Sequence, residues 1–301
     1  MESIIPWIRA ARLRTLPLAL SCVVISAFIA QKANSFGWNI FVLAVLTTIL
    51  LQVLANFAND YGDAQNGADN ENRVGPDRMV QSGLITQAQM KTGIITTIIL
   101  TLISGISLLV VAFGELLYSS HVILLFVLGV ISIIAALKYT AGVDPYGYKA
   151  MGDLSVFIFF GILGVLGNIY LYTHEIEWIN VLPAISIGAL SMAVLNLNNM
   201  RDRIEDAKVG KRTIPVIIGQ KSAKKYHFGL FFLALVCAMA YSFCTAQKAV
   251  HLIYIIPFVV LLIHLIKVSK SNLPDDFDPE LKKVALSTFV FALLFGIGLI
   301  L

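Results

Sequence analysis

The sequence WNIFVLAVLTTILLQVLANFANDYGD occupies residues 38–63 and joins an uncharged apolar run to a pair of acids. No Asp, Glu, Lys or Arg interrupts the run from Trp38 to Asn59. A bilayer core roughly 30 Å thick requires a helix of about 20 such residues. We therefore predict a transmembrane helix over 38–58, with Asp60 and Asp63 at its end.

Further apolar runs extend this pattern over the whole chain. Together they predict nine helices, at 15–31, 38–58, 92–113, 118–137, 153–173, 178–198, 227–246, 250–268 and 284–301. Of the 301 residues, 58% are hydrophobic and only 13% are charged, whereas soluble chains carry roughly 25% charged residues. This composition excludes a soluble domain. We expect an all-α polytopic protein, embedded in the lipid bilayer as a single domain over 1–301.

Charge distribution orients the predicted helices. If the N-terminus and every second loop share one side, 20 of the 22 Lys and Arg residues lie there, leaving only Lys32 and Lys248 opposite. Positive residues concentrate on the cytoplasmic side of membrane proteins, so the N-terminus is expected to be cytoplasmic. The net charge of +4 is small and scattered, and we expect no nucleic-acid partner.

Acidic residues are crowded on the same side, where 15 of the 18 Asp and Glu residues lie. The first acidic cluster follows the run at 38–58 and contains Asn59, Asp60 and Asp63, with Asp69 further on. If the helix continues, Asn59 and Asp63 share a face, because residues four apart are neighbours on a helix. Acids contribute little to membrane topology, so this crowding indicates a function.

The second acidic cluster ends the predicted helix at 178–198, where Asp202 and Asp206 are four residues apart. Like charges at this spacing destabilise a helix and require a counter-ion. Carboxylate and amide oxygens suit Mg²⁺, which completes its octahedron with water and phosphate oxygens. The alternative is that both clusters are solvated helix ends, neutralised by neighbouring Arg and Lys.

Cations lie between the two clusters in the sequence. Arg73, Arg78 and Lys149 flank Gly and Pro residues near the acids, and such side chains bind phosphate oxygens. Ordinary enrichment of positive residues on the cytoplasmic side is the competing explanation. At the start of the first predicted helix, Arg14 either reaches an anionic substrate or anchors the helix.

These features predict a Mg²⁺–diphosphate site at the cytoplasmic mouth of a central apolar cavity. A ligand with a diphosphate head and a long hydrocarbon tail fits such a site, and the site would favour ionisation by stabilising charge on the leaving group. A secondary transporter that uses the acids for ion coupling is an alternative. Transporters usually place such groups near the membrane midplane, whereas these acids map to helix ends and loops.

The sequence resembles the UbiA-type intramembrane prenyltransferases. The resemblance is carried by Asn59-Asp60-x-x-Asp63 with Asp69, by Asp202-x-x-x-Asp206, and by nine predicted helices that cover essentially the whole chain. Within this family the chain is most similar to the branch that acts on 1,4-dihydroxy-2-naphthoate. The closer match includes Arg12-Leu13-Arg14-Thr15-Leu16-Pro17, Arg73-Val74-Gly75-Pro76-x-Arg78, Tyr146-Gly147-Tyr148-Lys149 and Gly152-Asp153.

One position departs from the common spacing of the family. The family places a third Asp four residues after Asp63, where this chain has Gly67, and Asp69 follows two residues later. The shifted spacing is a feature of the naphthoate branch. The two acidic clusters also resemble each other in sequence. This internal similarity suggests that the chain consists of two homologous halves, at about 1–140 and 141–301.

The resemblance implies that a polyprenyl group passes from polyprenyl diphosphate to 1,4-dihydroxy-2-naphthoate, with loss of CO₂, in the cytoplasmic membrane of a bacterium. Within the family, the main alternative for this chain is a sibling enzyme that acts on 4-hydroxybenzoate or haem. The implied Mg²⁺ ligands are Asn59, Asp60, Asp63, Asp69, Asp202 and Asp206. Arg73, Arg78, Tyr139 and Lys149 would contact the diphosphate, and Arg14 the aromatic carboxylate. Asp63, Asp202 and Lys149 are the expected catalytic residues.

Overall fold

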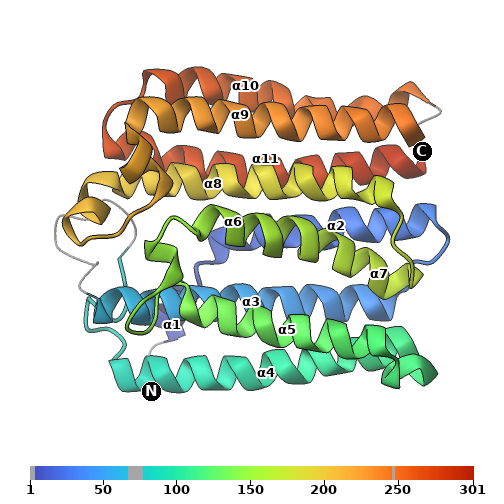
Figure 1. Ribbon diagram of the computed structural model, residues 1–301, viewed down its shortest axis with the longest axis horizontal. Coiled ribbons are helices and arrows are strands. Elements are labelled where there is room, and N and C mark those ends of the chain that lie inside the picture. Colours follow the sequence, from blue (N-terminus) through green and yellow to red (C-terminus); the bar gives the residue numbers. More distant parts are fainter. Residues whose placement is uncertain (1–3, 67–76, 246–247) are drawn as a thin grey trace.

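A computed structural model describes residues 4–66, 77–245 and 248–301. In these ranges regular structure is helical, apart from an isolated bridge between Lys149 and Arg212. Nine helical segments within the described ranges are long and apolar enough to cross a membrane. Figure 1 shows the long helices side by side with their axes roughly parallel. The predicted all-α membrane fold is confirmed.

The helical elements of the described ranges run the length of the chain. In chain order they are α1 (Ile4–Ala11), η1 (Leu13–Thr15), α2 (Leu16–Lys32), α3 (Trp38–Gln65), α4 (Gln87–Phe113), η2 (Gly114–Tyr118), α5 (Ser120–Lys138), η3 (Tyr146–Tyr148), α6 (Gly152–Val156), η4 (Phe157–Gly167), α7 (Asn168–Thr173), η5 (Trp178–Asn180), α8 (Val181–Lys208), α9 (Ile214–Thr245), η6 (Ala249–Tyr254), α10 (Ile255–Lys270), η7 (Pro274–Asp276) and α11 (Asp278–Ile300). Of these, η4 is a π-helix that continues α6 into α7.

Several helices extend beyond their predicted ends. The predicted helix at 38–58 continues as α3 to Gln65, and the one at 178–198 continues as α8 to Lys208. An apolar run predicts only the part of a helix that lies in the bilayer. The predicted ranges therefore end before the polar turns that continue each helix. Both acidic clusters therefore lie on helical backbone. On α9, Gly219 has a φ of 76° and separates a short first part from the long second part.

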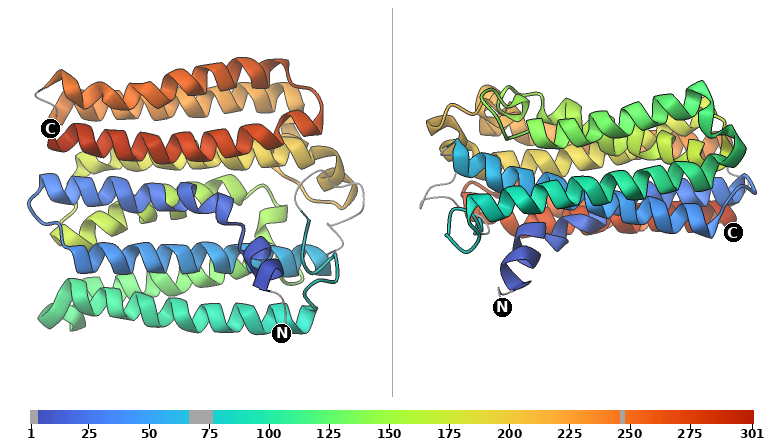
Figure 2. Two further views of the ribbon diagram at one scale, coloured as in Figure 1. Left: turned by 180° about the vertical axis from the view of Figure 1, so that it is seen from behind. Right: turned by 90° about the horizontal axis from the view of Figure 1, so that it is seen from below.

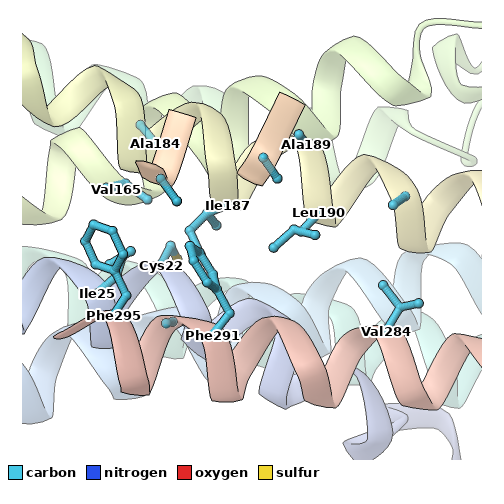
Figure 3. Packing of buried hydrophobic residues seen from close by; sticks show 14 of the residues in the cluster. Cys22, Ile25, Val165, Ala184, Ile187, Ala189, Leu190, Val284, Phe291 and Phe295 are labelled. Atoms are coloured by element: carbon cyan, nitrogen blue, oxygen red, sulfur yellow. The ribbon is translucent and has the colours of Figure 1, made fainter. Parts of the chain in front are cut away.

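The main core lies where α2, η4, α8 and α11 meet. Figure 3 shows Ile25, Val165, Ile187 and Phe291 directed toward one another from these four elements. Seen from behind in Figure 2, α2 lies between α11 and α3, and it packs against both. This packing fixes α8, which carries the second acidic cluster, relative to the N-terminal half of the chain.

An apolar cavity of about 410 Å³ lies mainly among α3, α4, α5 and η4, with residues of α2 and α7 also in its wall. Apolar side chains such as Leu109, Leu125 and Phe159 line most of it. Polar residues line it as well, among them Asn59 and Tyr139. Because Asn59 is in the first acidic cluster, the cavity reaches the end of the bundle that carries the acids.

Candidate functional site

The buried carboxylate of Asp63 binds two groups from different loops. Arg78 Nη2 donates to Asp63 Oδ2 over 2.6 Å, and both side chains are less than a tenth exposed. The Tyr148 hydroxyl donates to Asp63 Oδ1 over 3.0 Å. Asp63 therefore joins the end of α3 to the segments that carry Arg78 and Tyr148.

Asn59 and Asp60 have different contacts from Asp63. Both Asp60 oxygens accept backbone N–H bonds, from Met79 over 3.0 Å and from Val80 over 3.2 Å. Asn59 Oδ1 accepts the Thr140 hydroxyl over 3.0 Å. Asp60 thus holds the turn that follows Arg78, and Asn59 helps to join α3 to the end of α5.

In the second cluster, the Asp202 carboxylate forms a bidentate pair with its neighbour Arg201. Arg201 Nε and Nη2 donate to its two oxygens over 2.7 and 2.8 Å. Arg201 also donates to Asn198 Oδ1 over 2.9 Å and pairs with Asp278 at the start of α11. This guanidinium is buried, so its charge is compensated within the protein.

Asp206, one turn further along α8, pairs with Lys211. Lys211 Nζ lies 3.4 Å from Asp206 Oδ1. The other oxygen, Oδ2, is buried and has no hydrogen-bond partner among the residues that the structure describes. The chain folds back after α8 because Gly210 adopts a φ of 75°, and the Lys211 N–H then donates to the Asp206 carbonyl over 2.8 Å.

Tyr148 and Lys211 connect the two acidic clusters. While its hydroxyl binds Asp63, the Tyr148 ring lies under Lys211, whose Nζ is 5.2 Å from the ring centroid. This distance is within the range of a cation–π interaction. The Arg212 N–H also donates to the Tyr148 carbonyl over 2.9 Å. The structure therefore brings Asp63 and Asp206 into one site, at the left end of α3 and α8 in Figure 1.

The proximity of these carboxylates shifts the pKa values of neighbouring groups. Burial alone disfavours the charged form of Lys211, but the carboxylates of Asp206, Asp63 and Asp202 outweigh it, so the pKa of Lys211 is raised above its ordinary value. Burial raises the pKa of the Tyr139 hydroxyl, and nearby groups, including Asp63 and Asp206, raise it further. Lys211 is thus a cation and Tyr139 a neutral phenol at neutral pH.

The donors fit a divalent ion that is only partly coordinated by protein. Among the described residues, no three His, Cys, Asp or Glu side chains are arranged around one point. Mg²⁺ does not need such a cage, since it commonly takes one or two carboxylates and completes its shell with water and phosphate oxygens. Asp206 Oδ2 is a buried carboxylate oxygen without a partner, which is suited to a cation.

The other residues predicted for the site do not take part in the contacts that link the two acidic clusters, as far as the described residues show. Lys149 is about half exposed and pairs with Asp144 in a surface pocket that Arg212 also lines. Arg14 Nη1 lies 3.6 Å from Asp278 Oδ2, next to the pair formed by Arg201 and Asp278. Asp69 and Arg73 lie outside the described residues.

Three residues of the site had no predicted role: Tyr148, Arg201 and Lys211. Arg201 and Lys211 were counted among the positive residues of the cytoplasmic side. The signal for Lys211 was Gly210, which allows the chain to turn back toward Asp206 four residues earlier. Nothing local indicated that Tyr148 would reach Asp63, 85 positions earlier in the sequence.

Comparison with known sequences identifies a family and its members. The model of the UbiA prenyltransferase family matches residues 19–293. A 1,4-dihydroxy-2-naphthoate octaprenyltransferase of Haemophilus influenzae is 41% identical, over 100% of this chain and 97% of the relative. The Escherichia coli protein of the same name is 37% identical, over 98% of this chain and 95% of the relative.

Solved structures of similar fold are more distant in sequence. The apo structure of a UbiA homolog from Aeropyrum pernix K1 has a TM-score of 0.70 at 14% identity, covering 96% of this chain and 98% of that one. A UbiA homolog from Archaeoglobus fulgidus, bound to GPP and Mg²⁺, has a TM-score of 0.62 at 16% identity, covering 96% and 99%. These similarities establish a common fold.

Proposed function

This chain belongs to the UbiA prenyltransferase family, and from that premise we propose that it prenylates 1,4-dihydroxy-2-naphthoate. The donor is polyprenyl diphosphate, and diphosphate and CO₂ are released to give the quinol form of demethylmenaquinone. Relatives named for octaprenyl transfer to this naphthoate, at 41% and 37% identity over nearly the whole chain, support this substrate. Family membership also favours a transferase over an ion-coupled transporter.

The observation that carries the proposal is the contact series Asp63–Tyr148–Lys211–Asp206 near the polar end of an apolar cavity. Charged and apolar surfaces next to each other suit a diphosphate head and an isoprenoid tail. The cavity walls would keep water from the allylic cation formed when the C–O bond breaks, so that the aromatic ring captures it.

In this proposal Asp63, Asp202 and Asp206 hold Mg²⁺, directly or through water. When bound, Mg²⁺ supplies electrostatic stabilisation of the charge on the departing diphosphate. The positive charges of Arg78, Lys149 and Arg73 bind diphosphate oxygens, and Tyr139 donates a hydrogen bond from its neutral hydroxyl.

Asn59 and Asp60 support this site through their contacts with Thr140 and the turn at 79–80. Asp69 completes the acidic motif, and Arg14 binds the carboxylate of the naphthoate.

The cavity is proposed to open toward the cytoplasm of a bacterial cell, because 20 of the 22 Lys and Arg residues map to that side. The soluble aromatic acid would then enter from the cytoplasm, while the isoprenoid arrives through the bilayer.

Product analysis tests the proposed function. Purified protein is incubated with Mg²⁺, octaprenyl diphosphate and either dihydroxynaphthoate or 4-hydroxybenzoate, and the products are identified by mass. We expect prenylated naphthoquinol and CO₂ only with dihydroxynaphthoate, EDTA to stop turnover, and excess Mg²⁺ to restore it. Prenylated hydroxybenzoate, or turnover indifferent to EDTA, would contradict the proposal.

A further inference from the structure

Lys211 differs from the other cytoplasmic lysines in its surroundings. Its side chain is only 14% exposed, whereas that of Lys208, on the preceding turn, is 59% exposed. Lys208 pairs with Glu205 at the surface, over 2.7 Å. Lys211 instead lies between the Tyr148 ring and the Asp206 carboxylate. Placing a lysine in such a position costs side-chain entropy and desolvation, and the attraction of the carboxylates of Asp206, Asp63 and Asp202 offsets that cost.

Each candidate metal-binding acid has a cation of its own. Asp63 pairs with Arg78, Asp202 with Arg201, and Asp206 with Lys211. The two arginines form short contacts of 2.6 to 2.8 Å. The lysine contact is longer, at 3.4 Å, and within the described ranges Asp206 Oδ2 has no hydrogen-bond partner. Asp206 is therefore the acid whose counter-ion is held least tightly.

We propose that Lys211 is an exchangeable counter-ion: it competes with Mg²⁺ for Asp206 and binds the diphosphate once the metal ion is in place. This inference rests on the proposed function, since it assumes a Mg²⁺–diphosphate ligand. A lysine suits the exchange because its ammonium is a compact charge on a flexible stem, unlike the planar fork of arginine. Tyr148 gives that stem an aromatic surface along which to move while its hydroxyl stays on Asp63.

The proposal predicts opposite effects on two ligands. Without Lys211, Mg²⁺ alone meets an Asp206 carboxylate that no cation neutralises, and it binds more tightly. The Mg²⁺-loaded site then lacks one positive charge toward the diphosphate, which binds more weakly. A charge-assisted contact contributes about a factor of ten in affinity, so each shift is expected to be about tenfold.

Titration calorimetry of the purified full-length chain in detergent tests both effects. Wild type, Lys211→Met, Lys211→Arg and the control Lys208→Met are titrated first with MgCl₂ alone and then, in saturating Mg²⁺, with inorganic pyrophosphate. Lys211→Met should bind Mg²⁺ about tenfold more tightly and pyrophosphate about tenfold more weakly. Lys211→Arg should restore pyrophosphate binding, and Lys208→Met should behave like the wild type in both titrations.

Two kinds of failure are distinguishable. If the wild type binds Mg²⁺ and pyrophosphate but Lys211→Met leaves either affinity unchanged, the role of Lys211 is refuted and the proposed function stands. If the wild type binds neither ligand, the proposed function itself fails. Circular dichroism melting identifies any variant that has lost its fold, and Lys211→Gln then replaces Lys211→Met with the same expected shifts.

Discussion

At the residue scale, the acids of the first cluster differ in what their side chains contact. Asp63 faces Arg78 and Tyr148, whereas Asp60, three positions earlier on α3, accepts two backbone amides. A carboxylate held by a cation can exchange partners when another cation arrives. A carboxylate that satisfies buried amides cannot be withdrawn without leaving those donors unpaired, which costs about 1–3 kcal/mol. The two aspartates should therefore respond differently to the same substitution.

Asp63→Asn and Asp60→Asn test this difference. Asp63→Asn should lower the initial rate of prenyl transfer by at least about 100-fold, because it removes a carboxylate proposed to hold the Mg²⁺ that stabilises the leaving group. It should also lower the melting temperature, because it leaves the buried Arg78 without its counter-ion. Asp60→Asn should lower the free energy of unfolding by about 1–3 kcal/mol, because its new NH₂ group faces a backbone donor. The exposed Asp275→Asn is the control for both measurements. An Asp63→Asn variant that keeps more than about a tenth of the activity would contradict the metal-binding role.

At the scale of the elements, the sequence predicted the helices well and their ends less well. Hydropathy identifies only the turns that lipid covers, so the extensions of α3 and α8 into the acidic clusters depended on a helix continuing through polar residues. The π-helical geometry of η4 has no hydropathy signal, and η4 crosses α8 closely. A Cβ on Gly161 would lie 2.8 Å from both the Ala184 carbonyl oxygen and Gly188 Cα. Small residues at such crossings let helix backbones approach in membranes.

Gly161→Ala should therefore destabilise the protein, by about 1–3 kcal/mol, because the added methyl group meets backbone atoms that cannot move away easily. Gly129→Ala on α5 is the matched control, since a Cβ there has no heavy atom within 4 Å. The two variants are compared by thermal melting in detergent. Equal melting temperatures would show that the crossing of η4 and α8 tolerates a side chain.

At the scale of the whole molecule, one end of the bundle combines charge, apolar cavity and chain crossings. Arg201 on α8 and Arg14 in η1 both contact Asp278 at the start of α11, so ion pairs join the N-terminal and C-terminal segments near the site. The opposite end carries few charges. This asymmetry gives the molecule one predicted orientation in the membrane.

Cysteine labelling tests that orientation. Cys22 and Cys237 are buried, and Cys244, one residue before the end of α9, is exposed on the predicted outer end. A membrane-impermeant maleimide added to right-side-out vesicles should label the wild type and fail to label Cys244→Ser. Ser82→Cys in the Cys244→Ser background should be labelled only after the vesicles are opened. Labelling of Ser82→Cys in intact vesicles would reverse the predicted topology.

The sequence by itself determined the membrane class and the nine spans, and it predicted the orientation and the candidate acids of the site, because hydropathy, charge and short-range spacing are local properties. It also contained the motifs of the UbiA family. Only the tertiary structure decided which acids face one another, that Asp60 holds a turn, and that Tyr148 and Lys211 join the clusters. These contacts connect residues up to 85 positions apart, and they form because the segments that carry Tyr148 and Lys211 meet between the ends of α3 and α8. Spacing along the chain carries no information about such distances.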